Sequence, residues 1–117
     1  MTGLVWYRAG LSAEAAVARL YTRSGRPVTA TRWRGLGGEI DLIARDGAEV
    51  IFIEVKQAST HARAAGRVSP HQMRRIMNAA SEFLAGEPDG QGTAVRFDVA
   101  LVDRQGSIEI VENAFAA

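Results

Sequence analysis

The sequence predicts one α/β domain in which helices cover a mixed β-sheet. Apolar residues recur at helical spacing in two segments, five shorter segments alternate or run apolar as strands do, and turn residues separate them. In chain order these segments are one helix, three strands, one helix and two strands. Because the chain has only 117 residues and no internal repeat, we expect residues 1–117 to form a single domain around one core.

The first helix is predicted over residues 12–24. Ser12 would be its N-cap, Glu14 would lie in the first turn, where the helix dipole favours a carboxylate, and Gly25 would end it. Glu14 lies close to the apolar stripe of this helix, so its side chain is expected to point partly inward.

The second helix has clearer boundaries. Ser69 is a suitable N-cap, Pro70 suits the first helical position, and Gln72 occupies the third position of a capping box. Apolar residues then recur at helical spacing up to Leu84, and Gly86 ends the pattern.

The strands are predicted from alternation, from apolar runs and from the turns between them. They are Val28–Trp33, Glu39–Arg45, Val50–Lys56, Ala94–Val102 and Ser107–Val111. Asp46-Gly47 is a strong turn signal, so the second and third strands should form a hairpin, and the last two should form another. Residues 57–69 are predicted to be a polar loop.

The first hairpin brings acidic residues and a lysine to one face of the sheet. A four-residue loop would place Asp41 opposite Glu54, whereas a two-residue loop would place Glu39 there. Because side chains alternate with period 2, both registers put Asp41, Glu54 and Lys56 on one face, and an odd-length loop would separate them. Opposed Cβ atoms lie roughly 4.5–5.5 Å apart, so two carboxylates would repel unless a cation lay between them.

These three side chains match the needs of metal-assisted phosphodiester cleavage. Two carboxylates suit Mg²⁺ or Mn²⁺, and a nearby lysine could hold the attacking water or stabilise developing charge. Lys56 is the single lysine in a chain that otherwise uses arginine, and lysine, unlike arginine, can lose its proton on burial. A Glu54–Lys56 ion pair at the end of a central strand, with Asp41 as a surface carboxylate, would also account for the spacing. Glu39 could assist on the same face, although a solvated carboxylate at the hairpin end is the simpler interpretation.

Charge is unevenly distributed along the chain. Residues 55–81 carry five basic side chains and no acidic one, whereas residues 82–117 carry two basic and seven acidic ones. The basic stretch favours an anionic partner such as nucleic acid, although a solvated helix face and a loop could carry the same charges.

The hairpin sequence resembles a known family. Residues 38–46 (GEIDLIARD) and 51–56 (IFIEVK) look like the corresponding segments of the YraN-like family of small bacterial proteins. That family is similar to the PD-(D/E)xK nuclease superfamily, which has the restriction-endonuclease-like fold. The resemblance extends to residues 14–16, 69–84 and 96–99, and it implies an αβββαβ core with a mixed sheet, in agreement with the elements above.

The resemblance also implies roles for single residues. Asp41 and Glu54 would be metal ligands, Lys56 the catalytic lysine, and Glu14 the acidic residue of the first helix.

Two positions depart from the family pattern. Gln57 stands where threonine is usual, and Gln72 stands where lysine is frequent, which would weaken a phosphate contact. The side chains expected to contact phosphates without reading sequence are Gln57, Arg63, Arg67, Arg74 and Arg75.

Five further side chains have weaker claims to a role. Asp98 lies in an apolar strand and suits a structural hydrogen bond. His61 and His71 have no ligand spacing and suit the surface. Trp6 and Trp33 could stack on bases, but packing in the core or at an edge suits them better.

The expected function is Mg²⁺-dependent cleavage of DNA, with branched or flapped structures as candidate substrates. A nucleic-acid-binding module that does not cleave, and a protein-interaction domain that uses a sheet edge, are the alternatives. The lack of cysteine excludes a disulfide scaffold and a cysteine nucleophile. With no secretory signal and no apolar run near the ~20 residues of a membrane helix, a cytoplasmic protein without membrane contact is expected. A chain this short would reach two strands more easily as a homodimer, which the sequence leaves open.

Overall fold

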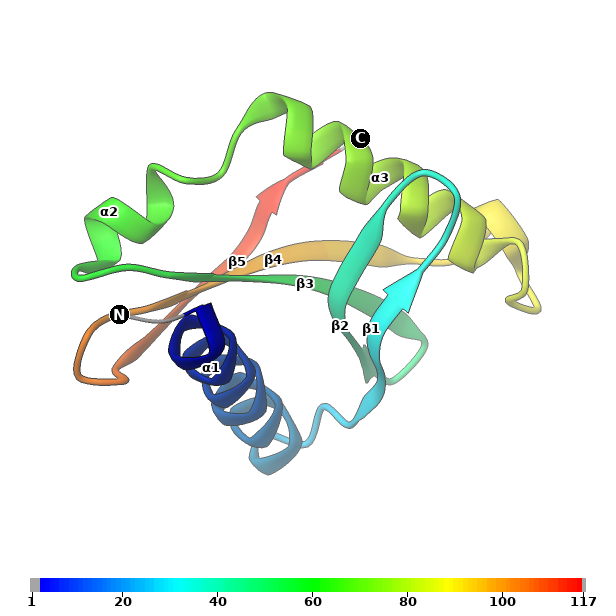
Figure 1. The fold of residues 1–117 in the computed structure, drawn as a ribbon. Coiled ribbons are helices and arrows are strands. Elements are labelled where there is room, and N and C mark those ends of the chain that lie inside the picture. Colours follow the sequence, from blue (N-terminus) through cyan, green and yellow to red (C-terminus); the bar gives the residue numbers. More distant parts are fainter. Residues whose placement is uncertain (1–2, 117) are drawn as a thin grey trace.

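Helices cover both faces of the sheet (Figure 1), with residues 13–21 packed on one face and residues 64–84 on the other. This computed structural model describes the backbone of residues 3–116 and the side chains of residues 12–116. The elements are α1 (Gly3–Arg23), β1 (Val28–Arg34), β2 (Glu39–Asp46), β3 (Glu49–Gln57), α2 (His61–Ala65), α3 (Pro70–Leu84), a 3-10 turn (Gly90–Gly92), β4 (Val95–Val102) and β5 (Ile108–Phe115). The strand order is β1-β2-β3-β4-β5. Strands β3 and β4 are parallel, and the other neighbouring pairs are antiparallel.

The core is formed on both faces of the central strand β3. Val50–Ile53 are at most 1% exposed, which confirms that this apolar run is a strand buried on both sides. Ile51 and Ile53 pack against α1, whereas Val50 and Phe52 pack against α3. Helices α2 and α3 form the crossover that a parallel pair of strands requires.

The first helix is longer than predicted. It begins at Gly3, so Ser12 is not its N-cap and Glu14 does not lie in its first turn. Gly10 and Ser12 resemble a boundary, but a glycine inside a helix costs only about 1 kcal/mol, which neighbouring residues can offset.

The predicted loop 57–69 contains a short helix. Strand β3 continues to Gln57, and α2 then begins after Thr60, whose side-chain oxygen accepts a hydrogen bond from the Arg63 backbone N–H at 3.1 Å. Buried Ala64 packs against Val99 and anchors this helix to the sheet. The polar composition of this segment predicts a loop, although Thr60 is one of the residue types that commonly cap the start of a helix.

The last strand is also longer than predicted and continues to Phe115. Its pairing with β4 is interrupted between Phe97 and Val99, and Asn113 has a φ of 49°. Beyond this irregularity the Phe115 ring stacks on that of Phe97, with centroids 5.0 Å apart. The polar residues before Phe115 break the alternation from which strands are predicted, so the predicted strand ends at Val111, before the observed end of β5.

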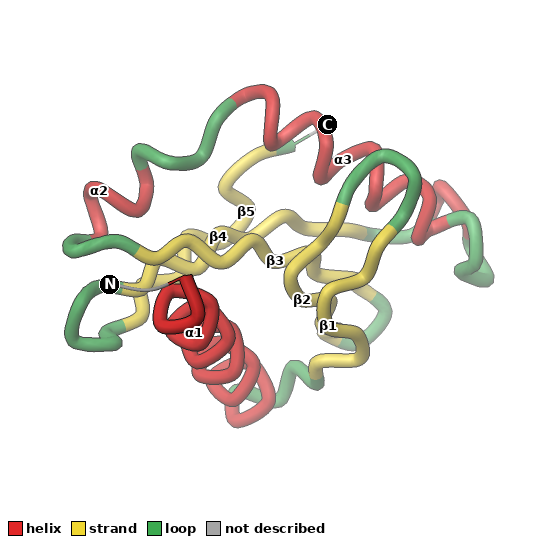
Figure 2. Tube along the Cα trace, viewed as in Figure 1, coloured by secondary structure: helices red, strands yellow, loops and turns green. Residues whose placement is uncertain are grey.

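The β2–β3 hairpin has the predicted register whose continuation would place Asp41 opposite Glu54. Backbone pairing ends one step earlier, at Leu42 and Ile53, and the turn is Gly47-Ala48, one residue later than the sequence signal. Past that last pair β2 leaves β3, and Figure 2 shows the β1–β2 hairpin curving toward α3. A fork therefore opens between the two strands at the predicted site.

In the described part of the chain, residues 3–116, no helix has the length and apolar character needed to cross a bilayer.

Candidate functional site

Asp41 lies in the fork between β2 and β3. Its Oδ2 accepts a hydrogen bond of 2.8 Å from the backbone N–H of Val55. Alternate backbone groups of β3 point toward β2, and the ladder that would have paired this N–H has ended at Ile53. The carboxylate thus replaces a missing backbone acceptor, which fixes the side chain at the end of a buried strand.

Glu54 lies beside Asp41 and is held by two donors. Its side chain is 7% exposed, and its Oε1 lies 3.2 Å from the Lys56 Nζ and 3.0 Å from the Gln72 Nε2, which donates to it. Lys56 follows Glu54 on the same face of β3, while Gln72 reaches across from the first turn of α3.

The start of α3 confirms the predicted cap in part. Ser69 Oγ accepts a hydrogen bond from the Gln72 backbone N–H at 3.1 Å, and Pro70 follows as the first helical residue. The Gln72 side chain, however, points to Glu54 and does not return to the cap, so the capping box is not reciprocal. Sequence reasoning missed this role of Gln72. The one signal that pointed toward the site was the resemblance, because Gln72 stands where lysine is frequent in the family.

The carboxylates open into a cavity of about 190 Å³ between the sheet and α3. Such a volume holds several water molecules. The side chains that line it are Glu39, Asp41, Glu54, Gln72, Arg75 and Ile76.

The fork disfavours the ionised form of both carboxyl groups, chiefly because both are buried. Burial, the Glu54 carboxylate and, more weakly, Glu14 raise the pKa of Asp41 from 3.8 to about 7. Burial also raises the pKa of Glu54 above its ordinary value, and Lys56 opposes that shift without cancelling it. One ammonium group therefore does not compensate for two carboxylates in this fork.

Glu14 approaches the pair from α1. It is close enough to raise the pKa of both Asp41 and Glu54, but its Oε2 pairs with the Arg32 Nε at 3.1 Å. Within the described residues, no group of three or more histidine or acidic side chains is arranged to hold a metal ion. The structure thus brings Asp41, Glu54 and Lys56 together, with Glu14 at the edge of the site.

The predicted phosphate contacts are dispersed. Arg75 lines the cavity, and Arg74 and Arg63 are exposed. The guanidinium of Arg67 donates to the backbone carbonyl of Gln57 at 2.7 Å. The Gln57 side chain belongs to a different cavity, which α1 helps to line, and it is not brought to the carboxylates.

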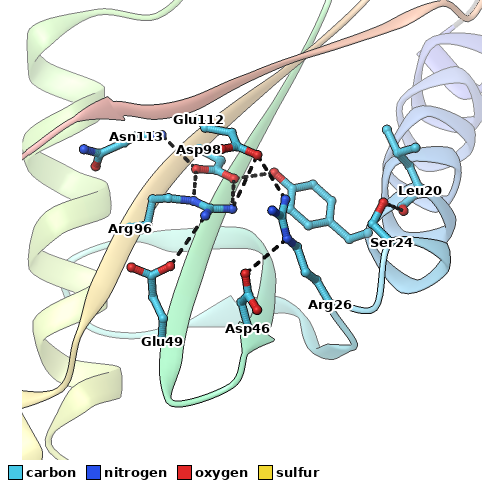
Figure 3. Close-up of polar contacts among 10 residues, drawn as sticks. Leu20, Ser24, Arg26, Asp46, Glu49, Arg96, Asp98, Glu112 and Asn113 are labelled. Atoms are coloured by element: carbon cyan, nitrogen blue, oxygen red, sulfur yellow. Dashed lines mark hydrogen bonds and ion pairs between the residues drawn. The ribbon is translucent and has the colours of Figure 1, made fainter.

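Asp98 forms a separate polar cluster, drawn in Figure 3. Its fully buried carboxylate accepts hydrogen bonds from the Tyr21 hydroxyl at 2.6 Å, from the Arg96 guanidinium at 2.8 and 3.0 Å and from the Asn113 backbone N–H at 2.9 Å. Burial and the Asp98 carboxylate hold the pKa of Tyr21 above its ordinary value. The prediction of a structural hydrogen bond for Asp98 is therefore confirmed.

The other candidates whose side chains the structure describes do not line the cavity of Asp41 and Glu54. The His61 Nε2 is 2.8 Å from the carbonyl oxygen of Ser107, and His71 is exposed. The Trp33 ring packs edge-on against Phe83, with centroids 5.5 Å apart, as predicted. The side chain of Trp6 lies outside the described residues.

Known proteins are similar to this chain over most or all of its length. Residues 13–102 match the model of "Uncharacterised protein family UPF0102". A UPF0102 protein of Cereibacter sphaeroides strain KD131 is 72% identical over 117 residues, covering 100% of both chains. A UPF0102 protein of Ruegeria pomeroyi is 60% identical over 107 residues, which are 92% of this chain and 87% of the relative. A UPF0102 protein of Dinoroseobacter shibae is 46% identical over 104 residues, or 89% and 78% of the two chains.

Proposed function

The chain belongs to the protein family UPF0102, and we propose that it is a Mg²⁺- or Mn²⁺-dependent nuclease that hydrolyses phosphodiester bonds in DNA. The observation that carries the proposal is the fork in the sheet, where Asp41 and Glu54 meet beside Lys56. The helix, three strands, crossover helices and further strand in that order also support a restriction-endonuclease-like core, with the fork at its centre.

The donor set fits a hard divalent cation. Asp41 and Glu54 offer carboxylate oxygens at the wall of a cavity that has room for water, which is how proteins usually bind Mg²⁺. Burial raises the pKa of both acids, and a cation bound between them would lower both pKa values and favour the ionised ligands. When bound, the cation would neutralise charge on the phosphate and make water a better nucleophile.

The chain's own residues would supply position and charge. Asp41 is fixed by Val55 and Glu54 by Gln72, so neither carboxylate needs to be ordered when the cation binds. The Lys56 ammonium lies 3.2 Å from Glu54 Oε1 and would orient the attacking water or stabilise negative charge on the phosphoryl oxygens. Arg75, at the rim of the cavity, would contact an adjacent phosphate without reading sequence.

The proposal is tested with linear, flapped and four-way-junction DNA in Mg²⁺ or Mn²⁺. We expect cleavage by the wild type, a loss of about 10²–10³-fold in Lys56→Ala, and no cleavage by Asp41→Asn. Arg104→Ala removes an exposed cation from a different cavity and should cleave normally.

Two outcomes would exclude the nuclease. If the wild type and Lys56→Ala form the same amount of product, the cleavage comes from a contaminant. If the wild type binds DNA in a salt-sensitive manner and forms no product on any substrate, the chain is a binding module.

A further inference from the structure

The loop between β1 and β2 presents a fully exposed apolar side chain. Leu36 is 102% exposed, and the only other large hydrophobic side chain exposed among the described residues is Val111 on β5, at 38%. The Leu36 side chain therefore has no packing role within the described part of the domain.

The loop that carries Leu36 is held in place. The Glu82 carboxylate of α3 accepts hydrogen bonds from the backbone N–H groups of Leu36 and Gly37, each at 2.9 Å. A Cβ at Gly35 would collide with that carboxylate, and a Cβ at Gly37 would lie 2.9 Å from the Cβ of Asn78. Two glycines thus allow the loop to sit directly on α3, with Leu36 pointing away from it.

The loop also stands beside the candidate site. Gly38 has a φ of 155°, and a Cβ there would lie 3.3 Å from the backbone carbonyl oxygen of Arg75. Arg75 and Glu39, the residue after Gly38, both line the cavity of Asp41. Leu36 lies further along the same loop, anchored at Glu82, which is about 10 Å along α3 from Arg75.

We propose that Leu36 is a wedge that enters the base stack of a nucleic acid whose backbone lies at the Asp41–Glu54 cavity. The inference rests on the proposed function, which it deepens by naming a substrate class: duplexes whose stacking is already interrupted. Proteins use leucine in this way, and separating one base step costs a few kcal/mol. The cost is least where a base is unpaired or next to a break, so flaps and junctions would be preferred to continuous duplex.

Rigidity and surroundings favour a nucleic acid over a protein partner. A loop already fixed by Glu82 pays little ordering entropy when it inserts. One leucine between glycines gives little apolar area, whereas a stable protein interface buries about 800 Å² on each partner. Arg74 and Arg75 are exposed on α3, the helix that anchors the loop, and can bind the flanking phosphates.

The first test reports unstacking without cleavage. A flapped duplex with 2-aminopurine at the branch is added to the Lys56→Ala protein in Mg²⁺, and the fluorescence is recorded. We expect binding to increase the signal severalfold with Leu36 present and not with Leu36→Ala. Leu36→Met should retain the increase, and Val111→Ala is the matched control for an exposed apolar side chain elsewhere.

The second test uses the cleavage-competent protein. Leu36→Ala should lower kcat/KM on the flapped duplex about tenfold and leave cleavage of a linear single strand unchanged, because its bases are not stacked in a duplex. Equal rates for the two proteins on the flap, or an equal loss on both substrates, would overturn the wedge.

The combined results separate the two proposals. Cleavage that needs Lys56 together with a fluorescence signal that ignores Leu36 would leave the nuclease and refute the wedge. A Leu36-dependent fluorescence signal without any cleavage would support the wedge and refute the nuclease. Failure to bind the flap at all, or a change from dimer to monomer in Leu36→Ala, would also overturn the wedge.

Discussion

Replacing Asp41 with asparagine should stabilise the metal-free protein and remove its response to Mg²⁺. Asparagine has the shape of the protonated acid, keeps an oxygen for the Val55 N–H and has no charge to bury. Since the pKa of Asp41 is raised from 3.8 to about 7, the ionised group in the folded protein is disfavoured by about 4 kcal/mol.

The effect must depend on pH in one direction. Between pH 3.8 and about 7 the folded protein keeps the Asp41 proton, whereas the unfolded chain has released it. Stability from the protonated form is therefore complete below pH 3.8 and is lost as the pH rises through about 7. We expect Asp41→Asn to match the wild type near pH 4 and to exceed it by about 2–4 kcal/mol at pH 8, roughly 10 °C in Tm.

Melting curves with EDTA or with millimolar Mg²⁺ measure both parts of this prediction. The wild type should gain stability from Mg²⁺ at pH 8, because a ligand that binds only the folded state raises Tm, and Asp41→Asn should not. Asp46→Asn is the matched control. Asp46 lies on the same strand but is exposed and pairs with Arg26 at 3.4 Å, so its loss should cost less than about 1 kcal/mol and leave the Mg²⁺ response intact. If Asp41→Asn is less stable than the wild type at pH 8, or still responds to Mg²⁺, the assignment of Asp41 fails.

Three further predictions concern the site and its support. The Mg²⁺ concentration that half-saturates the wild type in calorimetry should fall as the pH rises from about 6 to 8, because the ligands must lose their protons; an unchanged value would contradict the pKa assignment. Asp98→Ala leaves Arg96 and Tyr21 without their buried acceptor and should cost about 3–5 kcal/mol in urea unfolding, so a loss below about 1 kcal/mol would show that the cluster is dispensable. Ser69→Ala removes the cap of α3 and should cost about 1 kcal/mol, whereas Ser81→Ala, within the same helix, should cost less.

The fold was predictable where local pattern and burial agree. The β3 run Val50–Ile53 lies between two layers, and each of its residues is apolar because it faces α1 or α3. The start of α1 and the short α2 were not predictable in the same way, since glycine or polar residues there are offset by neighbouring helix and by contacts with the sheet. Such contacts depend on distant residues that a local pattern does not contain.

The candidate site was predictable as a set of residues but not as a geometry. Period-2 alternation was enough to put Asp41, Glu54 and Lys56 on one face. It could not reveal that β2 pairs with β3 only from Leu42 onward, or that Asp41, just before this pairing begins, takes the place of a backbone acceptor. The partner of Glu54 from α3 was hidden for a similar reason, because Gln72 is brought to the sheet by the crossover and not by sequence proximity.

The balance of charge in the fork favours a cation site over a structural ion pair. In a stabilising ion pair the positive partner lowers the pKa of the carboxylate, as a single Lys56 beside a single Glu54 would do. Here the second carboxylate, Asp41, is fixed by the backbone of the same strand, and burial raises the pKa of both acids despite the ammonium. Arg75 does not correct the imbalance, since it is exposed and water and salt screen its charge. A bound divalent ion would supply positive charge to both carboxylates, and the stability lost without it would be a consequence of keeping two ionisable ligands in place.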